Sequence, residues 1–85
     1  MSPSLGRIVL VKLRSMGEPV FYNGSDEHPA IVTAVHSATM INARIFVDGN
    51  EPPLWQTSIP FEESAEGYSG STWRWPPRIE PARES

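Results

Sequence analysis

Apolar and polar residues alternate along several short stretches of the chain, and this pattern predicts β-strands. The alternation is clearest over residues 40–48. Successive side chains of a strand point to opposite faces of the sheet, so one set of these residues faces a core and the other faces outward. We expect four side chains in the core: Ile41, Ala43, Ile45 and Val47. Asn42, Arg44 and Phe46 then lie on the outer face.

Other stretches rich in β-branched and aromatic residues are also predicted as strands. They cover residues 5–13, 28–36, 54–59 and 71–75. Residues 5–13 are apolar on both faces, which predicts a strand that is covered on both sides. In residues 54–59, the alternation places Trp55, Thr57 and Ile59 on one face.

The last predicted strand carries two tryptophans with one residue between them. Trp73 and Trp75 therefore share a face, while Thr72 and Arg74 point to the other. The Pro76-Pro77 pair that follows has no N–H groups for a sheet ladder, so we expect the strand to end at Trp75, at a sheet edge or a barrel seam.

Two longer connections, at residues 14–27 and 61–70, join these strands. The first contains Asn23-Gly24, the strongest hairpin signal in the chain, which we expect at the tip of an excursion. Short strands separated by turn signals predict an all-β domain. We expect residues 1–77 to form a small five-stranded, strongly bent antiparallel barrel of the Src-homology-3-like type, with an oligonucleotide-binding-type barrel as the alternative. Residues 78–85 are predicted to be a polar tail.

Composition narrows the kinds of partner that we expect. A chain of 85 residues without cysteine has a small core and no disulfide, so we predict a homo-oligomer. A net charge of −3 argues against long DNA or RNA, which bind basic surfaces through counterion release. A small anionic ligand fits, since a few arginines can hold one phosphate. The sequence has no membrane-spanning apolar run and no signal-peptide pattern, which predicts a cytoplasmic protein without a membrane partner.

Catalytic and metal-binding signatures are absent from the sequence. His28 and His36 would lie about 26 Å apart on one strand, at about 3.3 Å per residue, so they cannot share a metal there. We interpret both as surface or strand-end residues. The sequence contains neither a nucleophile elbow nor a phosphate-binding glycine loop. We therefore expect a protein that is not an enzyme and that needs no cofactor.

Arginine and aromatic side chains are the residue types that suit a small anionic ligand. Arginine pairs bidentately with phosphate, and stacking an aromatic ring on a base is worth about 1–3 kcal/mol. We expect ligand contacts from Arg7, Arg44, Arg74, Phe46, Trp73 and Tyr22. Tryptophans in a small barrel usually belong to the core, so the sequence leaves open whether Trp55, Trp73 and Trp75 face the core or a ligand.

Three short blocks of the sequence resemble a group of small bacteriophage-encoded β-proteins. The blocks are Gly6-Arg7-Ile8-Val9, residues 28–35 (HPAIVTAV) and residues 71–76 (STWRWP). In the closing block, Ser71 and Arg74 stand where the group carries Gly and His. The resemblance implies a phage origin and a compact β-domain.

Small phage proteins of this kind in turn resemble anti-CBASS sponges, which are oligomeric proteins that sequester the cyclic nucleotides of bacterial anti-phage signalling. This resemblance implies a phage protein that binds a cyclic di- or oligonucleotide in the host cytoplasm without turnover, in pockets between subunits. It transfers no site residue. The alternative is a non-enzymatic virion or host-protein interaction module, whose distinguishing feature would be a continuous apolar face without converging arginines.

Overall fold

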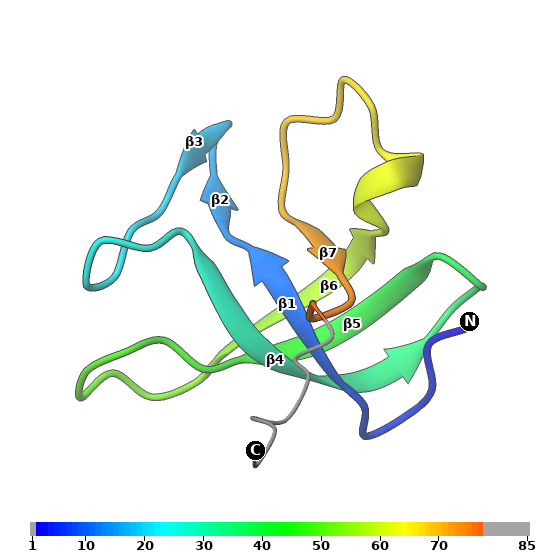
Figure 1. The fold of residues 1–85 in the computed structure, drawn as a ribbon, viewed down its shortest axis with the longest axis horizontal. Helices are drawn as coiled ribbons and strands as arrows, with labels where there is room; N and C mark the ends of the chain where they lie inside the picture. The colour runs from blue at the N-terminus through cyan, green and yellow to red at the C-terminus, as the bar shows by residue number, and fades with distance from the viewer. Residues whose placement is uncertain (1, 78–85) are drawn as a thin grey trace, which may run out of the picture.

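The computed structural model describes residues 2–77, which form a strongly curled antiparallel sheet (Figure 1). Five strands build this sheet in the order β6-β5-β4-β1-β7. They are β1 (Ile8–Lys12), β4 (Glu27–Val35), β5 (Met40–Ile45), β6 (Leu54–Pro60) and β7 (Thr72–Arg74). Phe61 and Trp73 form a parallel bridge between the two edges of the sheet and so partly close it. The predicted all-β fold with a bent five-stranded sheet is confirmed.

The long connections contain small elements of their own. Between β1 and β4, β2 (Arg14–Ser15) pairs with β3 (Glu18–Pro19). Between β6 and β7 lies a single 3-10 turn, η1 (Glu62–Ser64). No helix among residues 2–77 is long and apolar enough to cross a membrane. The polar tail predicted at residues 78–85 lies outside the described residues.

The hollow of the curled sheet holds the core. The four inward residues predicted from the alternation of residues 40–48 are all buried, which confirms that pattern. The buried apolar side chains are Val9, Val11, Leu13, Ala30, Val32, Ile41, Ala43, Ile45, Val47, Ile59 and Trp73. Because β-strands alternate, the burial of these residues sends their neighbours on the same strands to the outside of the sheet.

Trp73 is the largest side chain in the core, with 1% of its surface exposed. Its ring packs against Phe61 at 4.6 Å and against Trp75 at 5.2 Å between ring centroids. Its indole Nε1 donates a hydrogen bond of 2.8 Å to the carbonyl of Thr39, which also accepts 2.8 Å from the backbone N–H of Phe61. Thus one tryptophan joins β7, the end of β6 and the turn before β5.

A β-bulge in β6 corrects one prediction from the sequence. Ser58 has a φ of 58°, and the pairing of β5 with β6 shifts register between Ile41 and Ala43. The extra residue reverses the alternation, so Ile59 is buried while Trp55 and Thr57 are exposed. The expectation that Trp55, Thr57 and Ile59 share a face is therefore wrong.

Asn42 on β5 stabilises this bulge from the outer face. Its side-chain Oδ1 accepts hydrogen bonds of 2.9 Å from the backbone N–H of Ser58 and from the hydroxyl of Thr57. The Nε2 atom of His36 lies 2.9 Å from the same oxygen. These contacts offset the cost of a left-handed residue that is not glycine.

Within one chain, β1 is covered on one side only, and its cover by a partner chain stays a prediction. Val9 and Val11 are fully buried, but Ile8 on the opposite face is 51% exposed. An exposed isoleucine on a central strand leaves an apolar outer surface there.

We predict that Trp73→Phe lowers the free energy of unfolding by about 1–3 kcal/mol, because the change removes a buried donor and leaves a cavity. Urea denaturation measures the effect. Trp55→Phe is the matched control, since Trp55 is 50% exposed and the same change there should cost less than about 0.5 kcal/mol. Equal losses at both positions would contradict the closing role of Trp73.

Candidate functional site

Four side chains lie in a row across the outer side of the sheet. The strand registers place Ile8 opposite Ile31, Ile31 opposite Arg44, and Arg44 opposite Trp55. Ile8 and Trp55, at the two ends of the row, are 51% and 50% exposed. Since directly opposed residues on one face contact each other, the row forms a continuous strip over β1, β4, β5 and β6.

A second row runs beside the first. Leu10 lies opposite Pro29, and the backbone N–H of Phe46 donates 2.9 Å to the carbonyl of Pro29. Pro29 has no N–H to return this bond, which explains why β5 ends at Ile45 and Phe46 lies just beyond the ladder. Phe46 is 40% exposed. We call the two rows together the outer face: Ile8, Leu10, Pro29, Ile31, Arg44, Phe46 and Trp55.

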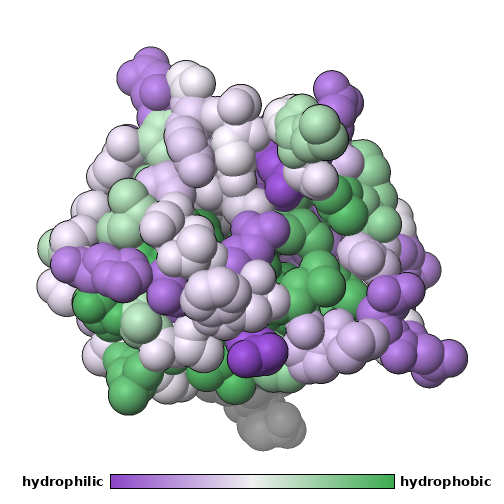
Figure 2. All heavy atoms as spheres, turned by 180° about the vertical axis from the view of Figure 1, so that it is seen from behind, coloured by the Kyte–Doolittle hydropathy of each residue, from purple (hydrophilic) through white to green (hydrophobic). Residues whose placement is uncertain are grey.

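Arg44 is an exposed cation in the first row, whereas Arg74 lies opposite Leu10 at the β7 end of the second row. No carboxylate in residues 2–77 forms an ion pair with Arg44. Phe46 follows on the same side of the chain, about 6.6 Å along the strand. On the side turned away from the viewer in Figure 1, apolar and strongly polar side chains reach the surface side by side (Figure 2). The outer face can therefore offer a charge and aromatic rings to one ligand.

Arg74 is held by a carboxylate. Its Nε and Nη2 atoms donate to the two oxygens of Glu27, the second at 2.8 Å. The Arg74 hydrogen bond lowers the pKa of Glu27 below its usual 4.5, and Glu27 in turn raises the pKa of Arg74. Three strand spacings separate β7 from β5, about 14 Å along the sheet, so Arg74 and Arg44 of one chain do not converge on one phosphate.

Arg7 and Trp73, which were also predicted to contact the ligand, make contacts within the domain instead. The guanidinium carbon of Arg7 lies 5.2 Å from the ring centroid of Trp75, a cation–π contact. Trp73 is in the core and presents no exposed ring face on which a base could stack. The question left open by the sequence is thus answered for Trp73 and Trp75, which pack in or against the core, and for Trp55, which is exposed.

A pocket of about 400 Å³ opens at the edge of the outer face, between Tyr22 and Phe46. Tyr22 begins the hairpin predicted from Asn23-Gly24, and it exchanges backbone hydrogen bonds of 2.9 and 3.1 Å with Ser25. Positive φ angles of 52° and 81° at the two turn residues fit that motif. The residues that line this Tyr22–Phe46 pocket are Tyr22, Asn23, Ser25, Glu27, His28, Pro29, Phe46, Val47 and Asp48.

His28 is a buried member of this lining, with 3% of its surface exposed. Its ring lies roughly perpendicular to the Tyr22 ring, at a centroid distance of 5.6 Å. No residue of 2–77 offers a hydrogen-bond partner to its buried Nε2 atom. A buried unpaired polar atom costs about 1–3 kcal/mol. The prediction that His28 is a surface or strand-end residue is therefore only half right, because it lies at the start of β4 but is buried.

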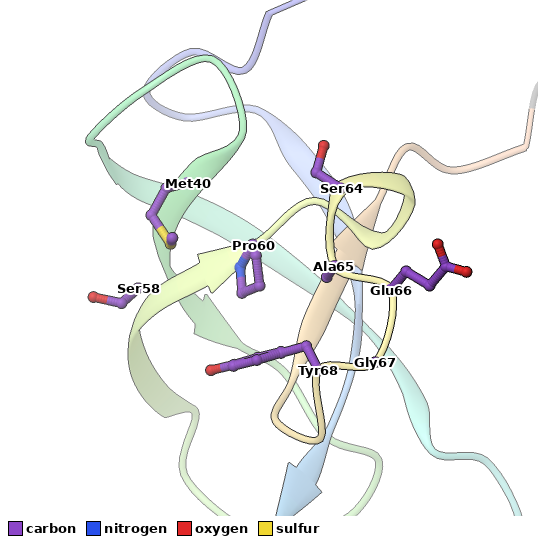
Figure 3. Close-up of a pocket in the computed structure, with 8 residues that line it drawn as sticks. All are labelled: Met40, Ser58, Pro60, Ser64, Ala65, Glu66, Gly67 and Tyr68. Atoms are coloured by element: carbon purple, nitrogen blue, oxygen red, sulfur yellow. The ribbon is translucent and has the colours of Figure 1, made fainter.

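A second pocket, of about 490 Å³, lies beside η1. Figure 3 shows the ring of Tyr68 reaching below Pro60 toward Ser58, while the side chain of Glu66 points away from the pocket. Gly70 makes room for this ring, since a Cβ atom there would lie 2.7 Å from Tyr68. Met40 and Ala65 add apolar surface to a lining that also contains Ser58 and Ser64. None of the ligand-binding residues predicted from the sequence lines this pocket.

The predicted site residues thus fall into two groups. Tyr22 and Phe46 line one pocket, and Arg44 is next to Phe46 on the outer face. Arg7, Arg74 and Trp73 are engaged elsewhere. Sequence reasoning left the exposure of Trp55 open and missed the burial of His28. The residues 2–77 contain no group of three His, Asp or Glu side chains placed to hold a metal ion.

We predict that Glu27→Gln lowers the free energy of unfolding at neutral pH and makes that free energy less dependent on pH below 4.5. The pKa of Glu27 is below 4.5 in the folded protein, so its stabilisation is complete above pH 4.5. As the pH falls below 4.5, the unfolded state binds the proton first, and this stabilisation is lost. Denaturation curves between pH 2 and pH 7 test this. Glu63→Gln, at an exposed position of η1, should change the pH dependence less.

Comparisons with protein-family models, curated proteins and solved structures found no match to this chain. The resemblance of its three short blocks to phage β-proteins, and the link from those proteins to cyclic-nucleotide sponges, stay predictions from the sequence.

Proposed function

We propose that this protein acts by binding rather than by catalysis, and that it sequesters a cyclic nucleotide at its outer face. The observation that carries the proposal is Arg44, an exposed guanidinium with Trp55 opposite it and Phe46 next to it on the same side. Guanidinium groups pair bidentately with phosphate, and exposed aromatic rings stack on bases.

The placement of acidic residues supports a phosphate contact at Arg44 and base contacts at the aromatic side chains. Asp48 and Glu51 lie in the loop between β5 and β6, and Glu27 at the edge of the outer face is paired with Arg74. Asp48 in the lining of the Tyr22–Phe46 pocket repels a phosphate there. We therefore assign the phosphate to Arg44 and the bases to the aromatic side chains.

A second subunit belongs to the proposal. The outer face is the outside of a curled sheet and covers one side of a ligand only, and the arginines of one chain do not converge. A homo-oligomer supplies Arg44 twice, once for each phosphate of a cyclic dinucleotide. Such sequestration would act in the host cytoplasm.

The order of the strands supports the Src-homology-3-like interpretation of the fold. In the five-stranded sheet, β1 lies between β4 and β7.

The test is a thermal-shift screen of the purified protein against cyclic di- and trinucleotides. A ligand at 100 times its dissociation constant adds about 2.7 kcal/mol, which raises the melting temperature of a domain this size by about 10 °C or more. We expect a selective shift with the ligand recovered intact. We expect Arg44→Gln to weaken binding about 10- to 100-fold, because a charge-assisted hydrogen bond is lost.

Arg14→Gln is the control for charge, since it removes the same charge from β2, outside the outer face. A flat screen at high ligand concentration contradicts the proposal. Equal affinity losses in the two variants would show a general charge effect rather than a phosphate contact at Arg44.

A protein-interaction module is the second candidate, and a specific observation favours it. Ile8, Ile31, Leu10 and Pro29 form a continuous apolar surface across β1 and β4, and the arginines of the sheet do not converge. Apolar surfaces of this kind mark interfaces with other proteins. On this reading, the outer face binds a virion or host protein.

Ile8→Ser tests this second candidate. If the outer face binds a virion or host protein, that protein should co-purify from infected cells with the unmodified chain, and Ile8→Ser should reduce its recovery about tenfold or more. Val35→Ser is the matched control, because Val35 is a 43% exposed apolar residue outside the outer face. Equal recovery with both variants contradicts an interface at Ile8.

A further inference from the structure

The Tyr22–Phe46 pocket and the outer face share one side chain, Phe46. Arg44 is next to Phe46 on the same side of β5, about 6.6 Å along the chain. A ligand whose phosphate binds Arg44 can therefore reach past Phe46 into the pocket. The pocket volume of about 400 Å³ falls in the range of about 300–1,000 Å³ that is usual for small-molecule sites.

We propose that this pocket is a base-binding subsite, which takes the planar ring of an amino-bearing nucleobase. The inference rests on the proposed nucleotide-binding function and names the part of the ligand that this pocket recognises. Tyr22 and Phe46 provide aromatic surfaces at the pocket. Any nucleobase can stack on such a surface, because every base has a planar π-face.

His28 gives the subsite its polar anchor. Its Nε2 atom is buried and has no hydrogen-bond partner among residues 2–77, although His28 belongs to the lining. A ring nitrogen or amino group of a base can complete this missing hydrogen bond. Because Nε2 is buried, a neighbouring side chain has to move before a ligand reaches it, and we assign this movement to Tyr22, whose ring lies roughly perpendicular to that of His28 at a centroid distance of 5.6 Å. The turn Asn23-Gly24 is exposed, which leaves room for that movement.

One of the two carboxylates in the pocket lining, Asp48, sets the selectivity of the subsite. Glu27 is engaged with Arg74, whereas Asp48 forms no ion pair within the described part of the chain. A carboxylate accepts hydrogen bonds from an exocyclic amino group and repels an anion. Adenine, cytosine and guanine carry such a group, and uracil does not. The subsite should therefore prefer the amino-bearing bases.

Uncharged nucleosides test the subsite without any phosphate contact. Nitrogen-15 NMR of the histidine rings follows His28 during titration with adenosine and, in parallel, with uridine. We expect the ring nitrogen signals of His28 to shift with adenosine and to shift several-fold less with uridine. His36 is an internal control, because it is exposed and bonds to Asn42 away from the pocket.

Variants then separate the subsite from the rest of the site. Tyr22→Ala should weaken adenosine binding about fivefold or more, since a stacking surface is lost. Phe21→Ala is the neighbouring control, an exposed aromatic residue that lines neither pocket and should leave affinity unchanged. Asp48→Asn should reduce the preference for adenosine over uridine. Both test positions are only partly buried or exposed, so the variants are expected to fold.

The failure of this inference differs from the failure of the proposed function. If a cyclic dinucleotide stabilises the protein while the His28 signals stay in place and Tyr22→Ala binds it normally, the base-binding subsite is overturned and sequestration stands. If neither nucleosides nor cyclic dinucleotides bind, both are overturned. Equal binding of adenosine and uridine overturns the role of Asp48.

Discussion

The burial of Trp73 is the constraint on which the sheet depends. β7 has only three residues, too few to hold a sheet edge through its ladder alone. The indole compensates by filling the core and by donating to the carbonyl of Thr39, where Phe61 also donates. Because Trp73 points inward, Arg74 points outward, and there it meets Glu27 from β4. The same placement that closes the core thus removes one arginine from the set available to a ligand.

The cations of the sheet differ in the partners that this geometry gives them. Arg74 neutralises Glu27, Lys12 lies 3.5 Å from Glu62, and Arg7 covers Trp75. Each of these contacts lowers the field that the side chain presents to a ligand. Arg44 is different because its neighbours on the sheet are Ile31 and Trp55, which are uncharged. Its charge is therefore directed outward.

Local patterns predicted the parts of the structure that local forces determine. The alternation over residues 40–48 gave the inward side chains of β5, and Asn23-Gly24 gave the hairpin that carries Tyr22. Contacts between distant residues were not predictable in this way. Glu27 and Arg74 are 47 residues apart, and no periodicity links them. The exposure of Trp55 depends on the bulge at Ser58, a serine with positive φ that composition does not reveal.

The bulge at Ser58 also affects how copies of this domain can associate. β6 is an edge strand of the sheet. An edge strand is a template for pairing with a strand of another chain and hence for fibrillar aggregation. Pro52-Pro53 precedes the strand, while the bulge and Pro60 interrupt its far end. Only Leu54–Thr57 remains as regular backbone, which is short for stable strand addition. The bulge and the prolines thereby discourage growth of fibrils by edge-to-edge pairing at β6.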